Sequence, residues 1–196
     1  MAFEESAPDG KPMLAVADAS DLEAWLVENH DRPTGVWLVR ARPGSNHPAV
    51  AYEDMINLLL CYGWVDASVK VLDERRSLLW ISPRRKGSVW SKPNKQRLQR
   101  LAEQGRIQPS GQAVIDRAKA DGSWTTIDSA ENLEVPADLA AAFARDPGAR
   151  ANFDAFPPSA RKGYLGHIAM AKTPATRARR VATTVERCAA NLRPGA

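Results

Sequence analysis

Every segment with the residue pattern of a β-strand lies before residue 83, and this placement constrains the fold most strongly. VWLVRA (36–41) and SLLWIS (77–82) are rich in β-branched and aromatic residues, and MLAVA (13–17) is a short apolar run. WVDASVKVLD (64–73) alternates apolar with polar side chains, which predicts a half-buried strand whose apolar face carries Val65, Ala67, Val69 and Val71. A turn at Asp73–Arg75 predicts that the last two strands form an antiparallel hairpin.

Helical spacing of apolar side chains interrupts these strands twice. Residues 20–30 place Leu22, Trp25 and Leu26 on one face, and we expect Ser20 to cap this helix with Glu23 as the partner in a capping box. A second helix is predicted from residue 51 to Gly63, whose freedom at positive φ suits a helix end. The N-terminal half is therefore predicted to be a small antiparallel sheet with packed helices, and its core should include Trp25, Trp37 and Trp64.

After residue 83 the spacing is helical throughout, so the C-terminal half is predicted to be all-helical and the fold class α+β. The expected helix starts include Pro136, Pro147, Ser159 as a cap and Thr173-Pro174, and the last helix carries an apolar stripe of Val181, Val185, Cys188 and Leu192. We predict a flexible tail at 1–12, an α+β part at 13–105 and a helical part at 106–196, with a single compact unit as the alternative.

The reactive side chains show no pattern typical of an active site. His30, His47 and His167 lie in three separate segments, and no metal-binding, nucleophile-elbow or nucleotide-cradle motif is present in the sequence. Cys61 and Cys188 lie far apart in apolar surroundings, which is typical of buried reduced thiols. We therefore predict no catalytic residue, no metal and no cofactor, and we lean against an enzyme. The chain has no long apolar run, and we expect it in the cytoplasm.

The stretch SPRRKGSVWSKPNKQR (82–97) carries six basic side chains and no acidic one. Residues 82–121 hold ten basic and three acidic residues, whereas residues 1–81 hold seven and thirteen. We predict a helix from Lys92, with Ser91 as its cap, so that the basic residues in its first turn oppose the helix dipole. An anion bound there would reverse this unfavourable interaction. A solvated helix surface is the alternative.

These features together predict one ligand-binding surface at the strand-to-helix junction. Asp66 lies on the polar face of the preceding strand, where it is an exposed carboxylate, holds Arg84 or Arg85 across the hairpin, or faces a ligand. Trp80 and Trp90 flank the basic run and could stack on a base, a sugar or a guanidinium group. The predicted site comprises Asp66, Arg84, Arg85, Lys86, Ser88, Trp90, Ser91 and Asn94.

Three ordered segments, 59–68, 82–124 and 135–181, resemble the YdeI/OmpD-associated (OmdA, bacteriocin-protection) family. The second follows the pattern PRR-x-x-S-x-WS-x-x-N, and the first resembles ALCFGWIDG, with Ala67 where a glycine is typical. The resemblance implies a role in protection against bacteriocins or cationic antimicrobial peptides and an association with a porin. It supplies no catalytic residue.

Three functions follow as hypotheses. The first is a non-enzymatic stress or bacteriocin-protection protein that binds an anionic small molecule or a protein partner at the predicted site. The second is a nucleic-acid-binding module that uses residues 84–97, and its binding should weaken steeply with salt. The third is a small-molecule enzyme that uses Asp66 with Arg84 or Arg85.

Overall fold

A computed structural model describes residues 3–195, and the side chains of Phe3 and Glu4 are not described. The described chain divides into two compact units. Unit 1 contains the residues up to Ser88 and Pro93–Asp121, and unit 2 contains Val89–Lys92 and the residues from Gly122 onward. The predicted division between residues 105 and 106 is not tested by this grouping and stays a prediction.

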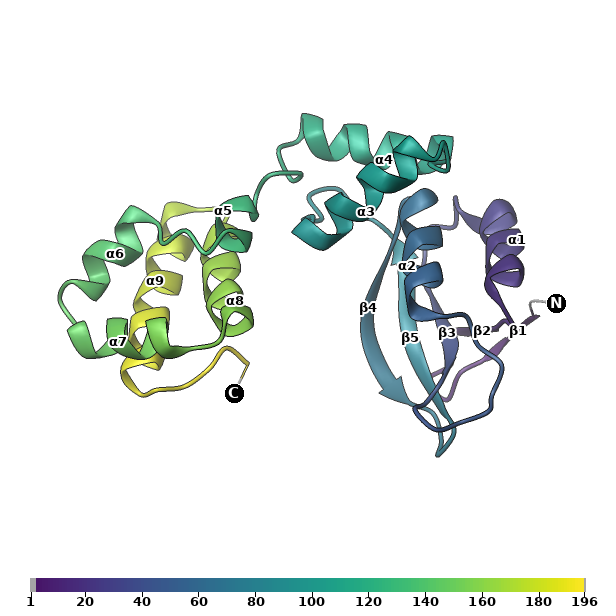
Figure 1. The fold of residues 1–196 in the computed structure, drawn as a ribbon, viewed down its shortest axis with the longest axis horizontal. Coiled ribbons are helices and arrows are strands. Elements are labelled where there is room, and N and C mark those ends of the chain that lie inside the picture. The colour runs from purple at the N-terminus through teal and green to yellow at the C-terminus, as the bar shows by residue number, and fades with distance from the viewer. Residues whose placement is uncertain (1–2, 196) are drawn as a thin grey trace. The chain divides into compact units, whose positions relative to one another are not determined.

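Unit 1 is a five-stranded sheet with helices (Figure 1). Its strands, in their order across the sheet, are β1 (Phe3–Ser6), β2 (Pro12–Ala15), β3 (Val36–Ala41), β5 (Arg76–Pro83) and β4 (Trp64–Val71). Its helices are α1 (Ala19–Asn29), α2 (Tyr52–Cys61), α3 (Lys92–Glu103) and α4 (Pro109–Ala120). The first residue of α3, Lys92, is grouped with unit 2, and the rest of that helix belongs to unit 1. The α+β class is thus confirmed.

The sheet is mixed, which corrects the prediction of an antiparallel sheet. β2 and β3 pair in parallel, with Met13 opposite Trp37, whereas the other neighbouring strands pair antiparallel. The reason lies in the connection: α1 carries the chain from the end of β2 back to the start of β3, and such a crossover joins parallel strands. The predicted tail also contains a strand, because β1 pairs with β2 between Phe3 and Ser6.

One face of the sheet is covered by α1 and α2, which lie side by side in Figure 1. Leu22, Trp25 and Leu26 are buried, and the rings of Trp25 and Trp64 meet edge to face with their centroids 5.4 Å apart. Trp37 lies on the opposite face and is also buried. All three predicted core tryptophans are therefore confirmed.

The prediction of alternating burial along β4 is wrong beyond Asp66. Val69 and Val71 are 61% and 69% exposed. β4 is an edge strand, and its register with β5 shifts between Asp66 and Val69. A bulge changes which face each later side chain takes, and an edge strand receives little cover from neighbours. The hairpin itself is confirmed.

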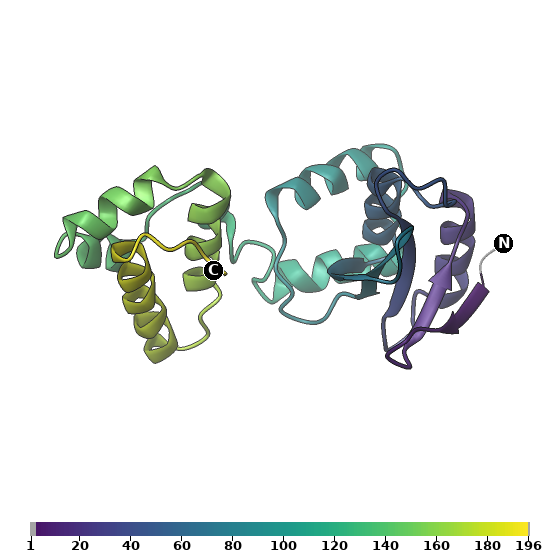
Figure 2. The same cartoon turned by 90° about the horizontal axis from the view of Figure 1, so that it is seen from below.

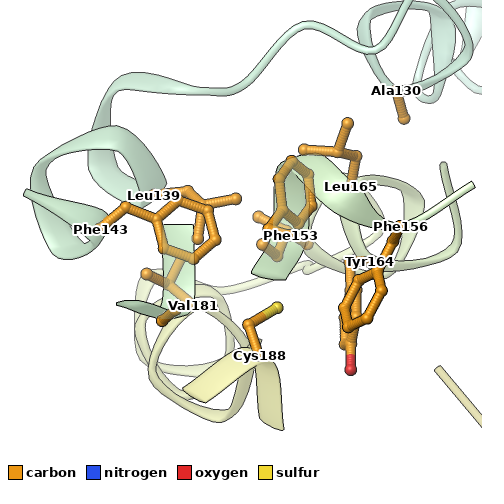
Figure 3. Packing of buried hydrophobic residues seen from close by; sticks show 11 residues of the cluster. Ala130, Leu139, Phe143, Phe153, Phe156, Tyr164, Leu165, Val181 and Cys188 are labelled. Carbon is orange, nitrogen blue, oxygen red and sulfur yellow. The ribbon is translucent and has the colours of Figure 1, made fainter. Parts of the chain in front are cut away.

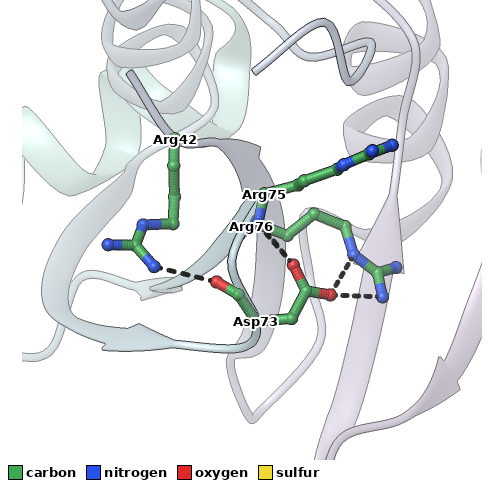
Figure 4. A network of polar contacts seen from close by, with 4 residues as sticks. All are labelled: Arg42, Asp73, Arg75 and Arg76. Atoms are coloured by element: carbon green, nitrogen blue, oxygen red, sulfur yellow. Dashed lines mark hydrogen bonds and ion pairs between the residues drawn. The ribbon is translucent and has the colours of Figure 1, made fainter. Parts of the chain in front are cut away.

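The β4–β5 turn is held by a polar network (Figure 4). The Asp73 carboxylate accepts hydrogen bonds from the backbone amides of Arg75 and Arg76 and from Nε of Arg76, at 2.8–2.9 Å. Nη1 of Arg42 donates to the Asp73 carbonyl at 2.9 Å. These contacts fix the turn to the end of β3.

Two of the predicted helix caps are wrong. The first helix starts at Ala19, because the Asp18 side chain accepts from the amide of Asp21 at 3.0 Å, and the Ser20 hydroxyl donates to Asp18 instead. α8 begins at Pro158, so Ser159 lies inside it. Thr173 does cap the last helix, as predicted, by accepting from the amide of Thr176.

Unit 2 contains the remaining helices, drawn from green to yellow in Figures 1 and 2. They are α5 (Asp128–Glu131), α6 (Ala137–Phe143), α7 (Pro147–Ala155), α8 (Pro158–Ala169) and α9 (Pro174–Ala189). Figure 3 shows their shared core, in which Phe153 lies between Leu165 and the ring of Phe143. Of the predicted α9 stripe, Val181 and Cys188 are buried, whereas Leu192 lies beyond the helix and is 44% exposed.

Candidate functional site

Arg84 stands at the end of β5 and is a buried cation. Arg84 directly follows Pro83, the last residue of β5. Its backbone amide donates to the carbonyl of Gly63 at 3.0 Å, and the residue is only 5% exposed. Burial lowers the pKa of Arg84 to about 10, and the nearby Asp66 carboxylate acts in the opposite direction. Nη1 of Arg84 reaches the Ser88 hydroxyl at 3.4 Å. The strand therefore ends in a desolvated positive charge, which is costly unless nearby negative charge or hydrogen-bond acceptors stabilise it.

Asp66 is half-buried and lies near two cations. It pairs with Ile81 in the β4–β5 ladder. Its negative charge partly offsets the lowering of the Arg84 pKa by burial, and it contributes less than Glu53 to the raised pKa of Arg97. The structure thus places Asp66 near Arg84, and the role of its carboxylate in holding Arg84 stays a prediction. Arg85 is exposed.

Arg97, which was not among the predicted site residues, is held by Glu53 of α2. Its Nε and Nη2 atoms donate to the two carboxylate oxygens of Glu53, both at 2.8 Å, and its Nη1 atom donates to Asn94 at 3.2 Å. The bonds to Glu53 are the main cause that raises the pKa of Arg97. This two-pronged geometry is the strong form of an arginine–carboxylate pair. Arg97 therefore fastens α3 to α2, and Asn94 of the same helix accepts a further hydrogen bond from its guanidinium group.

The predicted site residues do not all belong to one unit. Trp90 and Ser91 lie in unit 2, and the others lie in unit 1. Trp90 is 1% exposed, and its ring centroid lies 5.2 Å from that of Trp124. Trp90 therefore contributes to packing within its own unit. Of the two tryptophans that flank the basic run, Trp80 is the one that lines a pocket.

A cationic pocket lies at the end of β5, entirely within unit 1, and has a volume of about 540 Å³. We use the name "cationic pocket" for this cavity, which includes the turn before β2, the loop after α1 and the end of β5. Its charged lining residues are Lys11, Arg32, Arg84 and Arg85, and none of the described residues that line it is acidic. Two of the predicted residues, Arg84 and Arg85, therefore line the same cavity as Lys11 and Arg32, which come from distant parts of the chain.

Trp80 forms part of the pocket wall and is half-buried. Its ring meets Trp37 edge to face with 5.1 Å between centroids, and the Lys11 ammonium lies 4.9 Å from the Trp80 centroid. A Cβ atom added to Gly35 would lie 2.7 Å from the Trp80 ring and 2.3 Å from the carbonyl oxygen of Ile81. The absence of a side chain at Gly35 therefore makes room for Trp80.

Asp9 holds the turn that carries Lys11. Its Oδ2 atom accepts from Nε1 of Trp37 at 3.1 Å and from Nζ of Lys70 at 3.0 Å, and Oδ1 accepts from the Lys11 amide at 3.3 Å. The bond from Lys70 is the main cause that lowers the pKa of Asp9. One wall of the cationic pocket is thus fastened to the sheet by a carboxylate that itself lies outside the lining.

Residues 3–195 contain no group of three or more His, Cys, Asp or Glu side chains that could hold a metal ion. No helix in the described part of the chain is long and apolar enough to cross a membrane. Both cysteines are free and buried, as the sequence predicted.

The fold and the site define a two-unit α+β protein whose sheet unit carries a cationic pocket. The chain belongs to the family described as a domain of unknown function (DUF8412), whose model matches residues 14–114. Residues 132–191 match the OmdA family, described as "Bacteriocin-protection, YdeI or OmpD-Associated". This confirms the suspected resemblance for the C-terminal part. The segment 59–68 and most of 82–124 lie instead within the DUF8412 match. No curated protein and no solved structure is significantly similar to the chain.

Proposed function

We propose that the protein is a non-enzymatic stress or bacteriocin-protection protein that binds an anionic ligand in the cationic pocket. One observation carries the proposal: Lys11, Arg32, Arg84 and Arg85 line the same cavity, and its described lining contains no acidic residue. The OmdA match at residues 132–191 supports the protection role only through the description of that family.

The electrostatics favour an anion over a neutral or cationic ligand. Like charges gathered around a cavity repel one another, and a bound carboxylate or phosphate group would offset that repulsion. Hydrogen bonds between a guanidinium group and such an anion are about twice as strong as neutral ones. The Asp9 contacts hold the Lys11 turn in place beforehand, so less freedom is lost on binding.

The positive charge of the cationic pocket disfavours direct capture of a cationic peptide there. Its charge would repel such a peptide, so protection would have to follow from the bound anion or from a partner protein. The basic run is also a poor continuous nucleic-acid surface, because Arg84 is buried and Arg97 is paired with Glu53. We therefore rank nucleic acid below a small anion or an anionic protein group.

Calorimetric titration with pyrophosphate at low and high salt tests the proposal. Arg85 is suited to substitution because it is exposed and lines the pocket, whereas Arg84 is buried. We expect salt-sensitive binding that Arg85→Ala weakens several-fold. Arg106→Ala, which removes an exposed arginine of the same unit outside the pocket lining, should leave binding unchanged. No binding at low salt, or equal losses in both variants, would contradict the proposal.

A further inference from the structure

The cationic pocket is larger than a simple inorganic anion requires. Its volume of about 540 Å³ falls within the roughly 300–1,000 Å³ of pockets that hold drug-sized molecules. A phosphate or sulfate ion would contact the cations and leave most of this space unfilled. The volume therefore favours an organic molecule that carries a negative charge.

The remaining wall is mostly apolar, and its polar side chains are Thr34 and Ser82. Trp80 contributes an indole ring, and Pro12, Pro33 and Pro83 contribute compact apolar rings from three different segments. Pockets for organic ligands have this composition: mostly apolar walls with a few charged groups that fix orientation. The apolar wall is suited to a part of the ligand that is neither charged nor strongly hydrated.

The position of Trp80 within the pocket favours an aromatic part. Its edge-to-face contact with Trp37 and the close approach of Gly35 fix the orientation of the indole. Lys11 lies near its face, so a flat ring on the indole would place an attached anionic group close to a positive charge. A fixed aromatic ring beside cations is the arrangement by which proteins hold the bases of nucleotides without reading their sequence.

We infer that the pocket binds a small organic anion with a flat aromatic ring, of the kind found in mononucleotides, with the ring on Trp80 and the anionic group among Lys11, Arg32 and Arg85. The inference rests on the proposed function, because it assumes that the cationic pocket binds anions. It adds the class of ligand. It also gives Trp80 a role in selecting that ligand and gives Gly35 the role of leaving space for the indole.

The test separates the ring from the charge. The wild-type protein is titrated with AMP, with ribose 5-phosphate, which lacks the ring, and with adenosine, which lacks the phosphate. We expect AMP to bind about tenfold more tightly than ribose 5-phosphate, the ratio that a stacked base commonly contributes, and adenosine to bind more weakly than AMP. Titration with phenyl phosphate distinguishes a nucleotide ligand from a simple aromatic phosphate. The inference is supported if AMP or phenyl phosphate binds more tightly than ribose 5-phosphate.

Two substitutions assign the effect to Trp80. Trp80→Leu should weaken AMP about tenfold and leave ribose 5-phosphate unchanged, whereas Trp80→Phe keeps an aromatic ring and should retain most of the affinity for AMP. Equal losses for both ligands in Trp80→Leu would overturn the role of the ring. The near-ultraviolet circular dichroism of both variants shows whether the fold around Trp37 is preserved.

The outcomes separate this inference from the proposed function. Equal affinity for AMP and ribose 5-phosphate would overturn the aromatic ligand and leave anion binding intact. Failure of pyrophosphate, AMP and ribose 5-phosphate alike at low salt would overturn the proposed function itself. If a short single-stranded oligonucleotide binds far more tightly than AMP, the pocket is part of a nucleic-acid surface, and the inference of a small ligand is wrong.

Discussion

Two glycines within helices, Gly111 and Gly166, should respond to alanine in opposite directions. A Cβ atom at Gly111 of α4 would lie 2.1 Å from the carbonyl oxygen of Cys61 and 3.2 Å from that of Leu60, both at the end of α2. A Cβ atom at Gly166 of α8 would meet nothing within 4 Å. Helix propensity favours alanine over glycine at both positions. The difference between the two changes in unfolding free energy therefore measures the effect of the close packing of α4 on α2.

The expected magnitudes follow from these distances. Alanine gains roughly 0.5–1 kcal/mol over glycine inside a helix, and Gly166→Ala should raise the free energy of unfolding of unit 2 by about that amount. At Gly111 the contact is with backbone, which must move, and such overpacking costs about 1–3 kcal/mol. The net effect of Gly111→Ala should be a loss of roughly 1–2 kcal/mol in unit 1, or more if α4 detaches.

Urea unfolding measures both effects if each unit has its own probe. Tryptophan fluorescence reports mainly on unit 1, which contains Trp25, Trp37, Trp64 and Trp80, and amide hydrogen exchange in α8 and α9 reports on unit 2. A loss of 1–2 kcal/mol should lower the urea midpoint by about 0.5–1 M. If Gly111→Ala stabilises unit 1 as much as Gly166→Ala stabilises unit 2, the reasoning about the α2–α4 contact is refuted.

Three other predictions concern core packing, a thiol and a carboxylate. Phe153→Ala should destabilise unit 2 by about 3–5 kcal/mol, measured by hydrogen exchange, because the ring is 1% exposed at the centre of the core; a loss under about 1 kcal/mol would contradict that packing. Cys188 should resist alkylation in the native protein at neutral pH, since burial raises its pKa to about 11; rapid modification would count against its burial. An NMR titration should give Asp9 a pKa below the ordinary aspartate value, because Lys70 donates a hydrogen bond to its carboxylate. The stability from this contact is therefore present above the unfolded-state pKa and is lost as the pH falls through the lower folded-state pKa. An ordinary or raised pKa, or an unchanged Asp9 pKa in Lys70→Ala, would contradict the contact.

Local sequence patterns predicted those elements whose structure depends on nearby residues. The run VWLVRA was predicted as a strand and forms β3 with the same limits, and the predicted end of α2 at Gly63 agrees with its φ of 80°. The alternation in β4 failed because burial at a sheet edge depends on the neighbouring strand and on a register shift. Parallel pairing of β2 with β3 likewise depends on the path of the chain through α1.

The candidate site was predictable only in part, for a related reason. Arg84 and Arg85 stood out because basic residues cluster there in the sequence. Lys11 and Arg32 reach the same cavity from the β1–β2 turn and the loop after α1, and no local pattern relates these segments. Arg97 pairs with Glu53, which lies 44 residues earlier, so it could not be separated from the rest of the basic run.

The most direct test of anion binding in the cationic pocket is amide chemical-shift mapping by NMR during titration with AMP at low salt. We expect the largest shifts to cluster at the pocket, on Lys11, Gly35 and Arg85 together with the indole signal of Trp80. Shifts confined to residues 92–97 or to unit 2, or no shifts at all, would contradict it.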